Sequence, residues 1–119
     1  MKFLRLPGGP RFGLIGGRQD RPTPTLFVLG HGLETMQQQP VYTEVARLLF
    51  KQGVLSVVLD PPCHGEDIRP GEPAGMEGWR SRLEHGEPFV QAFTTHEKRV
   101  EASCTIRGIY ALADQKRRW

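Results

Sequence analysis

The sequence predicts a small α/β domain built around one strand–helix–strand unit. Residues 26–29 form a short, continuous apolar run that ends at Gly30, and residues 54–60 form a longer run rich in β-branched side chains. Continuous apolar runs are typical of strands covered on both faces of a sheet. Because the segment between them predicts a helix, the two strands are expected to lie parallel in the middle of the sheet, joined by a right-handed crossover.

The helix between these strands is expected over residues 40–52. Pro40 suits the first helical turn, where a backbone N–H has no helical acceptor. Gly53 can adopt the left-handed conformation that ends a helix. The apolar positions recur at helical spacing, which places most of them on one face. They are Tyr42, Val45, Ala46, Leu48 and Leu49.

The other segments complete a single domain. Two strand-like runs (residues 2–6 and 11–15) flank the turn signal at residues 7–10, so the N-terminus is expected to form a hairpin at the sheet edge. The four predicted parts are an edge hairpin (1–25), the strand–helix–strand core (26–60, with a polar connection over 31–39), a loop and partial cap (61–94, with a short helical turn at 77–83), and a second amphipathic helix (95–115).

Length and composition narrow the classes of function. A chain of 119 residues, 38% hydrophobic and 24% charged, can build one small core, so wholesale disorder is excluded. The formal charge of +3 lies partly in residues 116–118, and no basic stripe alternates with aromatic side chains. Nucleic-acid binding is therefore not expected. No stretch has transmembrane length and no signal peptide is visible, so the prediction is a cytoplasmic protein without membrane contact.

Two His-Gly pairs, each at the end of a buried strand, carry a resemblance to a known family. The first ends the segment Leu26-Phe27-Val28-Leu29-Gly30-His31-Gly32, and the second lies in Leu59-Asp60-Pro61-Pro62-Cys63-His64-Gly65-Glu66. The arrangement resembles the N-terminal portion of the α/β-hydrolase superfamily, over about residues 24–68. Gly78-Trp79-Arg80 and the helix from Thr95 are compatible with the segment that precedes that family's nucleophile. The implied fold is thus a partial α/β-hydrolase fold.

The resemblance implies roles for both turns. In acyl transfer, negative charge develops on the carbonyl oxygen, and fixed backbone N–H groups stabilise it. The resemblance assigns this oxyanion role to the N–H of Leu33, with His31 shaping the turn and Gly32 allowing close approach of a substrate. Asp60, His64 and Gly65 are expected to be structural, with the Asp60 carboxylate accepting backbone N–H groups of its loop. The implied substrates of a full-length member are small carboxylic esters or peptides.

A nucleophile is missing from this pattern. The family places it in Gly-x-Ser-x-Gly, on a turn between a strand and a helix. Ser56 lies inside a predicted strand, Ser81 has bulky neighbours, and Ser103 lies inside the second helix. Cys63 follows a strand, but Pro61 and the absence of a following helix argue against a cysteine nucleophile. No catalytic residue is therefore assigned.

No cofactor or metal is expected either. The candidate ligands are scattered, neither cysteine belongs to a CxxC pair, and His96-Glu97 lacks a second histidine at the spacing of a zinc protease. The candidate metal ligands are His31, Cys63, His64, Asp67, His85 and His96.

Three functions remain open on the sequence. The first is an N-terminal fragment of a serine α/β-hydrolase, of the esterase or peptidase kind, inactive alone. The second is a non-catalytic interaction module, because truncation would leave residues 54–59 as an exposed apolar edge that invites self-association or pairing with another chain. The third is a flavodoxin-like domain that binds an anion at residues 30–32. The first two predict marginal stability of the isolated chain.

Overall fold

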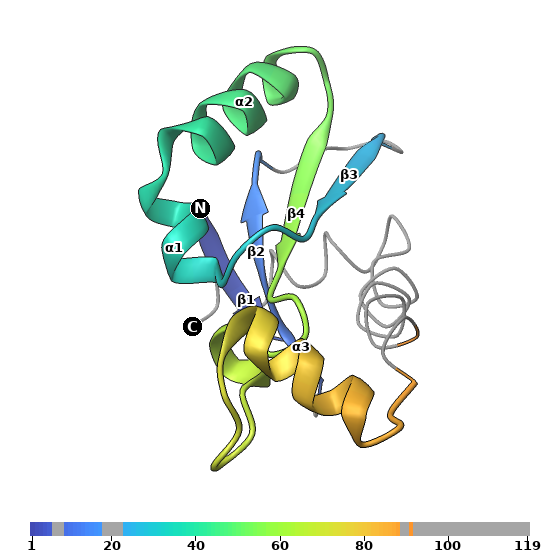
Figure 1. Cartoon of the computed structure of the whole chain (residues 1–119). Coiled ribbons are helices and arrows are strands. Elements are labelled where there is room, and N and C mark those ends of the chain that lie inside the picture. Colours follow the sequence, from blue (N-terminus) through green and yellow to red (C-terminus); the bar gives the residue numbers. More distant parts are fainter. Residues whose placement is uncertain (6–8, 18–22, 89–90, 92–119) are drawn as a thin grey trace.

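In the part of the chain that the structure describes, four strands form one mixed sheet in the order β1-β2-β4-β3 (Figure 1). The computed structural model describes residues 1–5, 9–17, 23–88 and 91. β1 and β2 form an antiparallel hairpin, β2 pairs antiparallel with β4, and β3 pairs parallel with β4. The strands are β1 (Lys2–Arg5), β2 (Arg11–Ile15), β3 (Thr25–Val28) and β4 (Leu55–Leu59). This arrangement confirms the α/β class and the parallel pair. The expectation that both parallel strands lie in the middle of the sheet is wrong for β3, which is at the margin of the described sheet because β2 pairs with the other side of β4.

The expectation of an exposed edge at residues 54–59 is wrong. The N-terminal hairpin forms one side of the sheet as expected, with β1 at the margin, and its second strand pairs with β4 from Phe12↔Leu59 to Ile15↔Ser56. β4 is therefore flanked on both sides. Within the part of the chain that the structure describes, the two margins of the sheet are β1 and β3.

Between residues 23 and 88 the structure places three α-helices and one short 3₁₀ helix beside the sheet. Figure 1 shows α1 and α2 on one side and α3 beyond the carboxyl end of β4. The polar connection expected over 31–39 is in part a helix, because buried Leu33 and Met36, three residues apart, give it an apolar anchor. The elements are α1 (Leu33–Gln38), α2 (Pro40–Lys51), η1 (Gly65–Asp67) and α3 (Gly75–Glu84), and α3 is longer than the turn expected at 77–83.

Both signals that bounded α2 are confirmed. Pro40 lies in the first turn of the helix. Gly53 has a φ of +83° just after the helix ends, and its N–H donates to the carbonyl of Phe50. The helix expected at residues 95–115 lies outside the described residues.

The two faces of the sheet carry different apolar clusters. One face contains buried side chains of β1, β2 and β4, with Phe27, Leu29 and Phe50 packed against them; they are Leu4, Phe12, Leu14, Leu55, Val57 and Leu59. On the other face, Val58 packs with Leu33 and Met36 of α1, beside Val28 and Tyr42. The helical layer therefore covers the carboxyl ends of the parallel strands, where the first His-Gly turn leaves the sheet.

The apolar face of α2 is only partly covered, which corrects the sequence interpretation. Ala46 is buried and Tyr42 packs against the sheet. Val45 and Leu48, which were expected on the same face, are 50% and 53% exposed. The apolar arc of α2 is thus wider than the part of the sheet beneath it.

Ser56 in β4 should be replaceable by Ala with a gain in stability. Its side chain is fully buried, and within the described structure its hydroxyl has no hydrogen-bond partner. Because an unpaired buried polar group costs about 1–3 kcal/mol, we expect Ser56→Ala to raise the free energy of unfolding by about 1 kcal/mol. Urea denaturation measures this, with Ser81→Ala on α3 as the control. A loss of stability would show that the hydroxyl is hydrogen-bonded in solution.

Candidate functional site

The two His-Gly turns lie against each other at the carboxyl ends of β3 and β4. An ideal Cβ added to Gly32 in the first turn (residues 30–33) would lie 3.3 Å from the backbone nitrogen of Gly65 in the second (residues 60–65). One added to Gly65, whose φ is +53°, would lie 2.2 Å from Oδ1 of Asp60. A side chain at Gly65 would therefore displace Asp60, so glycine is required there for space and for backbone conformation.

Asp60 joins the two turns. Its Oδ1 accepts the backbone N–H of Leu33 at 2.9 Å, across 27 residues of sequence. Asp60 is 6% exposed and Leu33 is fully buried, so the hydrogen bond is shielded from water. The carboxylate does accept a backbone N–H, as the sequence suggested, but the donor belongs to the other turn. The position just after β4 thus fixes the exit of β3.

Arg11 at the start of β2 compensates the charge of Asp60. Its Nε donates to Oδ2 of Asp60 at 2.7 Å, and its Nη2 lies 3.3 Å from Oδ1. The remaining donors reach Glu34 on α1, and the guanidinium stacks over Phe3 at 5.6 Å. These carboxylates raise the pKa of Arg11, and the Arg11 hydrogen bond is the main reason why the pKa of Glu34 falls below its ordinary value.

We call the contact between the two turns the clasp; it consists of the Leu33–Asp60 hydrogen bond and the Arg11–Asp60 ion pair. The clasp bears on the oxyanion role predicted for Leu33. The N–H of Leu33 points at Asp60 and has an acceptor inside the protein, whereas an oxyanion donor must point at the reacting oxygen. A substrate oxygen would have to displace a carboxylate that Arg11 also holds. The role of Leu33 stays a prediction, and the observed hydrogen bond works against it.

The two histidines of the turns point to different neighbours. His31 is exposed, with its ring edge-on to Tyr42 at 6.2 Å. His64 donates from Nδ1 to the carbonyl of Pro62 at 2.9 Å, and its ring lies 5.4 Å from that of Trp79. The Trp79 indole also donates to the Pro62 carbonyl. His64 therefore ties the second turn to α3, while His31 is free of the clasp.

Cys63 is buried in a strained backbone conformation. Its φ is +62°, a region that residues other than glycine seldom adopt, and its side chain is fully buried against Gly78 of α3. Burial raises the pKa of the Cys63 thiol to about 11, and the Glu72 carboxylate, 3.7 Å from the sulfur, adds to this. A neutral, enclosed thiol is a poor nucleophile, which agrees with leaving Cys63 without a catalytic role.

Cys63 should therefore resist alkylation in the folded protein. At pH 8, a thiol with a pKa of about 11 has on the order of a hundredfold less thiolate than an unperturbed cysteine. We expect iodoacetamide to modify Cys63 at least a hundredfold more slowly in the native chain than in 6 M guanidinium. A Cys104→Ser background isolates the signal, read by intact mass. Equal rates in both conditions would contradict the buried position.

A second ionic cluster fastens α3 to the loop after β4. Arg82 is 5% exposed and donates to both carboxylate oxygens of Glu72, to Oδ2 of Asp67 at 2.9 Å and to the Asp67 carbonyl. The Arg82 hydrogen bond lowers the pKa of Glu72 to about 2. Asp67 in turn accepts the N–H of Cys63. Through Asp67, the cluster thereby connects the second turn to Arg82 of α3.

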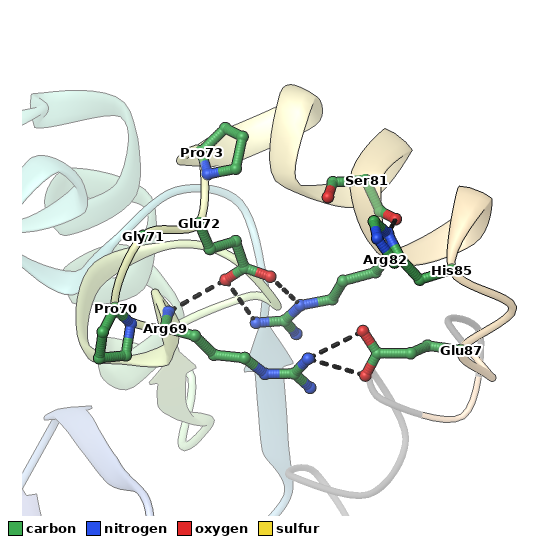
Figure 2. Close-up of a pocket in the computed structure, with 9 residues that line it drawn as sticks. All are labelled: Arg69, Pro70, Gly71, Glu72, Pro73, Ser81, Arg82, His85 and Glu87. Carbon is green, nitrogen blue, oxygen red and sulfur yellow. Dashed lines mark hydrogen bonds and ion pairs between the residues drawn. The ribbon is translucent and has the colours of Figure 1, made fainter.

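A hollow of about 370 Å³ opens beside this cluster (Figure 2). Figure 2 shows that its charged side chains face one another in pairs, Arg82 with Glu72 and Arg69 with Glu87. None of the lining residues belongs to the two His-Gly turns. They are Arg69, Pro70, Gly71, Glu72, Pro73, Ser81, Arg82, His85 and Glu87.

The described residues contain neither a metal-binding cluster nor a membrane-spanning helix. No three or more His, Cys, Asp or Glu side chains gather in a way that would hold a metal ion there. No helix in the same part of the chain is long and apolar enough to cross a membrane.

Comparisons with known proteins give no relative. No protein-family model matches the chain, and no curated protein or solved structure is significantly similar to it. The α/β-hydrolase relationship consequently stays a prediction from the two turns and their position on the sheet.

Sequence reasoning missed the residues that organise the site most strongly. Arg11 was read only as part of a strand, and Arg82 only as part of a short helical turn. The signal for Arg11 lies in the register, because pairing Phe12 with Leu59 puts Arg11 beside Asp60. That register becomes visible only once the N-terminal hairpin is known to pair with β4.

Proposed function

We propose that the chain corresponds to the N-terminal part of a serine α/β-hydrolase of the esterase or peptidase kind and has no hydrolase activity alone. The observation that supports this most is the position of the first turn between β3 and α1. It follows β3 and opens a helix, which is where such hydrolases provide one backbone N–H of the oxyanion hole. The second turn packs directly against it.

The second part of the proposal is that the chain has no catalytic nucleophile. Ser56 is buried in β4 and Ser81 lies within α3, so neither occupies a strand-to-helix turn. Cys63 is buried and its thiol is neutral. Ser103 lies outside the described residues. The purified chain should therefore bind no acyl group covalently.

Two observations test this function. Purified chain should show no hydrolysis of p-nitrophenyl butyrate above buffer and no mass adduct with a fluorophosphonate; saturable turnover lost in Cys63→Ala or Ser103→Ala would overturn it. The genomic DNA after the codon for Trp119, translated in all frames, should encode a Gly-x-Ser-x-Gly segment between a strand and a helix. Absence of such a segment would contradict the hydrolase origin.

A second candidate is a non-catalytic module that binds another polypeptide through its sheet edge. The observation in its favour is the position of β3, the last strand on its side of the sheet among the described residues, with Leu26 at 44% exposure. Exposed strand edges accept further strands through backbone hydrogen bonds. Leu26→Lys should abolish binding of such a partner in a pull-down, while Lys2→Glu on β1 should not.

A further inference from the structure

We propose that the carbonyl oxygen of a substrate binds at the first turn to the Tyr42 hydroxyl and the His31 imidazole, and not to the N–H of Leu33. We call these two side chains the outer pair. The inference rests on the hydrolase function proposed above, because it names the groups that would contact the ester or peptide. With the outer pair, the first turn binds an oxygen while the clasp stays closed.

The side of the first turn that carries Gly32 and Leu33 is already filled by protein. The Leu33 N–H donates to Asp60. An ideal Cβ on Gly32 would lie 3.3 Å from the backbone nitrogen of Gly65 and 3.7 Å from Oδ1 of Asp60. The space beside Gly32 is therefore taken by the second turn instead of by a substrate. Polar groups that remain available to a substrate lie on the other side of the turn, at Gly30.

Tyr42 reaches this other side from the start of α2. Its ring packs against the second apolar cluster, beside Val28, and this packing fixes its direction. A Cβ on Gly30 would lie 2.7 Å from the hydroxyl oxygen of Tyr42, so glycine is what lets the hydroxyl approach the exit of β3. Among the described residues, that hydroxyl has no hydrogen-bond partner. A phenol that is held by packing and keeps its hydroxyl free is a preorganised hydrogen-bond donor.

His31 supplies a second donor next to this hydroxyl. Its side chain is exposed and forms no hydrogen bond within the described part of the chain. The imidazole stands edge-on to the Tyr42 ring, with the ring centroids 6.2 Å apart. Two donors that share one acceptor oxygen lie up to about 5–6 Å apart, because each hydrogen bond is about 2.7–3.0 Å long. The spacing of the rings therefore permits one oxygen to accept from both side chains.

The outer pair also lies where an α/β sheet binds its ligands. His31 follows β3 closely, and Tyr42 lies in the first turn of the helix that leads to β4. Open α/β sheets bind ligands in the crevice at the carboxyl ends of their parallel strands. Tyrosine and histidine side chains serve as donors to the oxygen on which negative charge develops in acyl transfer. An ester or amide carbonyl therefore matches the chemistry of the outer pair.

An NMR titration with methyl butylphosphonate tests the proposal. This compound carries a negatively charged oxygen on a tetrahedral phosphorus and so mimics the acyl-transfer transition state. The isotope-labelled full chain is titrated while the ring signals of His31 and Tyr42 and the amide signal of Leu33 are followed. We expect saturable shifts of both rings, with the Leu33 amide unchanged because the clasp stays closed.

Four variants give the second readout. Tyr42→Phe removes only the hydroxyl, and Gly30→Ala displaces it from a glycine whose φ is not positive. We expect these two variants and His31→Ala each to weaken phosphonate binding about tenfold, the effect of losing one hydrogen bond to a charged oxygen. His85→Ala, at an exposed histidine of α3, should leave binding unchanged. Tyr42→Phe should melt within about 2 °C of the parent, because the hydroxyl it removes is unpaired.

The outcomes separate this inference from the proposed function. Equal affinity of the parent and Tyr42→Phe, or no saturable shift in the parent, would overturn the outer pair. A phosphonate-dependent shift of the Leu33 amide without shifts of the two rings would also overturn it and would return the oxygen to Leu33. None of these results bears on the hydrolase origin, which depends on whether the DNA downstream encodes a Gly-x-Ser-x-Gly segment.

Discussion

Replacing Asp60 by Ala is expected to cause the largest loss of stability of any single substitution in the site. The change leaves the Leu33 N–H without its acceptor and Arg11 without its most buried counter-charge. Removing one partner of a buried ion pair costs about 3–5 kcal/mol. Since domains of this size are stable by only about 5–15 kcal/mol, Asp60→Ala should remove a large share of the free energy of unfolding. Urea denaturation followed by circular dichroism measures the change.

Two control variants separate the causes. Glu34→Gln removes an Arg11 partner whose side chain is 58% exposed, so it should cost at most about 1 kcal/mol. Asp60→Asn keeps an oxygen acceptor of the same shape and should lose less than Asp60→Ala. If Asp60→Ala and Glu34→Gln destabilised the chain equally, the clasp between the turns would contribute no more to stability than an exposed ion pair.

Replacing Arg82 by Ala is expected to have the second-largest effect. Arg82 is the buried cation to which Asp67 and Glu72 both bind, and its loss leaves two carboxylates facing each other beneath Cys63. We expect a loss of about 3 kcal/mol, with α3 detaching first from the loop after β4. Limited proteolysis should cut near residues 68–75 in Arg82→Ala and not in the exposed control Arg80→Ala. Identical proteolysis in both variants would contradict this.

Because of the same cluster, the free energy of unfolding should depend on pH. The pKa of Glu72 is about 2 in the folded chain and about 4.5 in its ordinary state. A carboxyl whose folded pKa is depressed contributes stability that is present above its unfolded pKa and is lost as pH falls toward the folded pKa. The urea midpoint should therefore drop between about pH 4.5 and pH 2, and Glu72→Gln should flatten that part of the curve. If the urea midpoint of Glu72→Gln fell with pH as steeply as that of the parent chain, Glu72 would not be the source of the acid dependence.

The part of the fold that follows from sequence is the part set by local signals. The continuous apolar run of β4, Pro40 at the start of α2 and Gly53 after its end each act within a few residues, and each was found as expected. The sequence analysis placed the edge of the sheet wrongly, because the edge depends on which strand β2 pairs with. This is a long-range pairing that no local pattern specifies.

The candidate site divides in the same way. Asp60, Gly32 and Gly65 could be selected because they follow apolar runs typical of strands and because glycine permits close backbone approach. Their partners could not: Leu33 meets Asp60 across 27 residues, and Arg11 meets it across 49. The sequence therefore predicted the turns but did not predict that Asp60 accepts the Leu33 N–H, to which the family resemblance assigns an oxyanion role.

Hydrogen exchange at the Leu33 amide tests the central claim, that Asp60 clasps the two turns. The first amides of a helix have no helical acceptor and normally exchange quickly. Because Leu33 donates to buried Asp60, its amide should exchange at least a hundredfold more slowly than that of Thr35 in the same turn, and Asp60→Asn should reduce this protection tenfold or more. An unprotected Leu33 amide in the folded parent chain would contradict the clasp and return Leu33 to the oxyanion role.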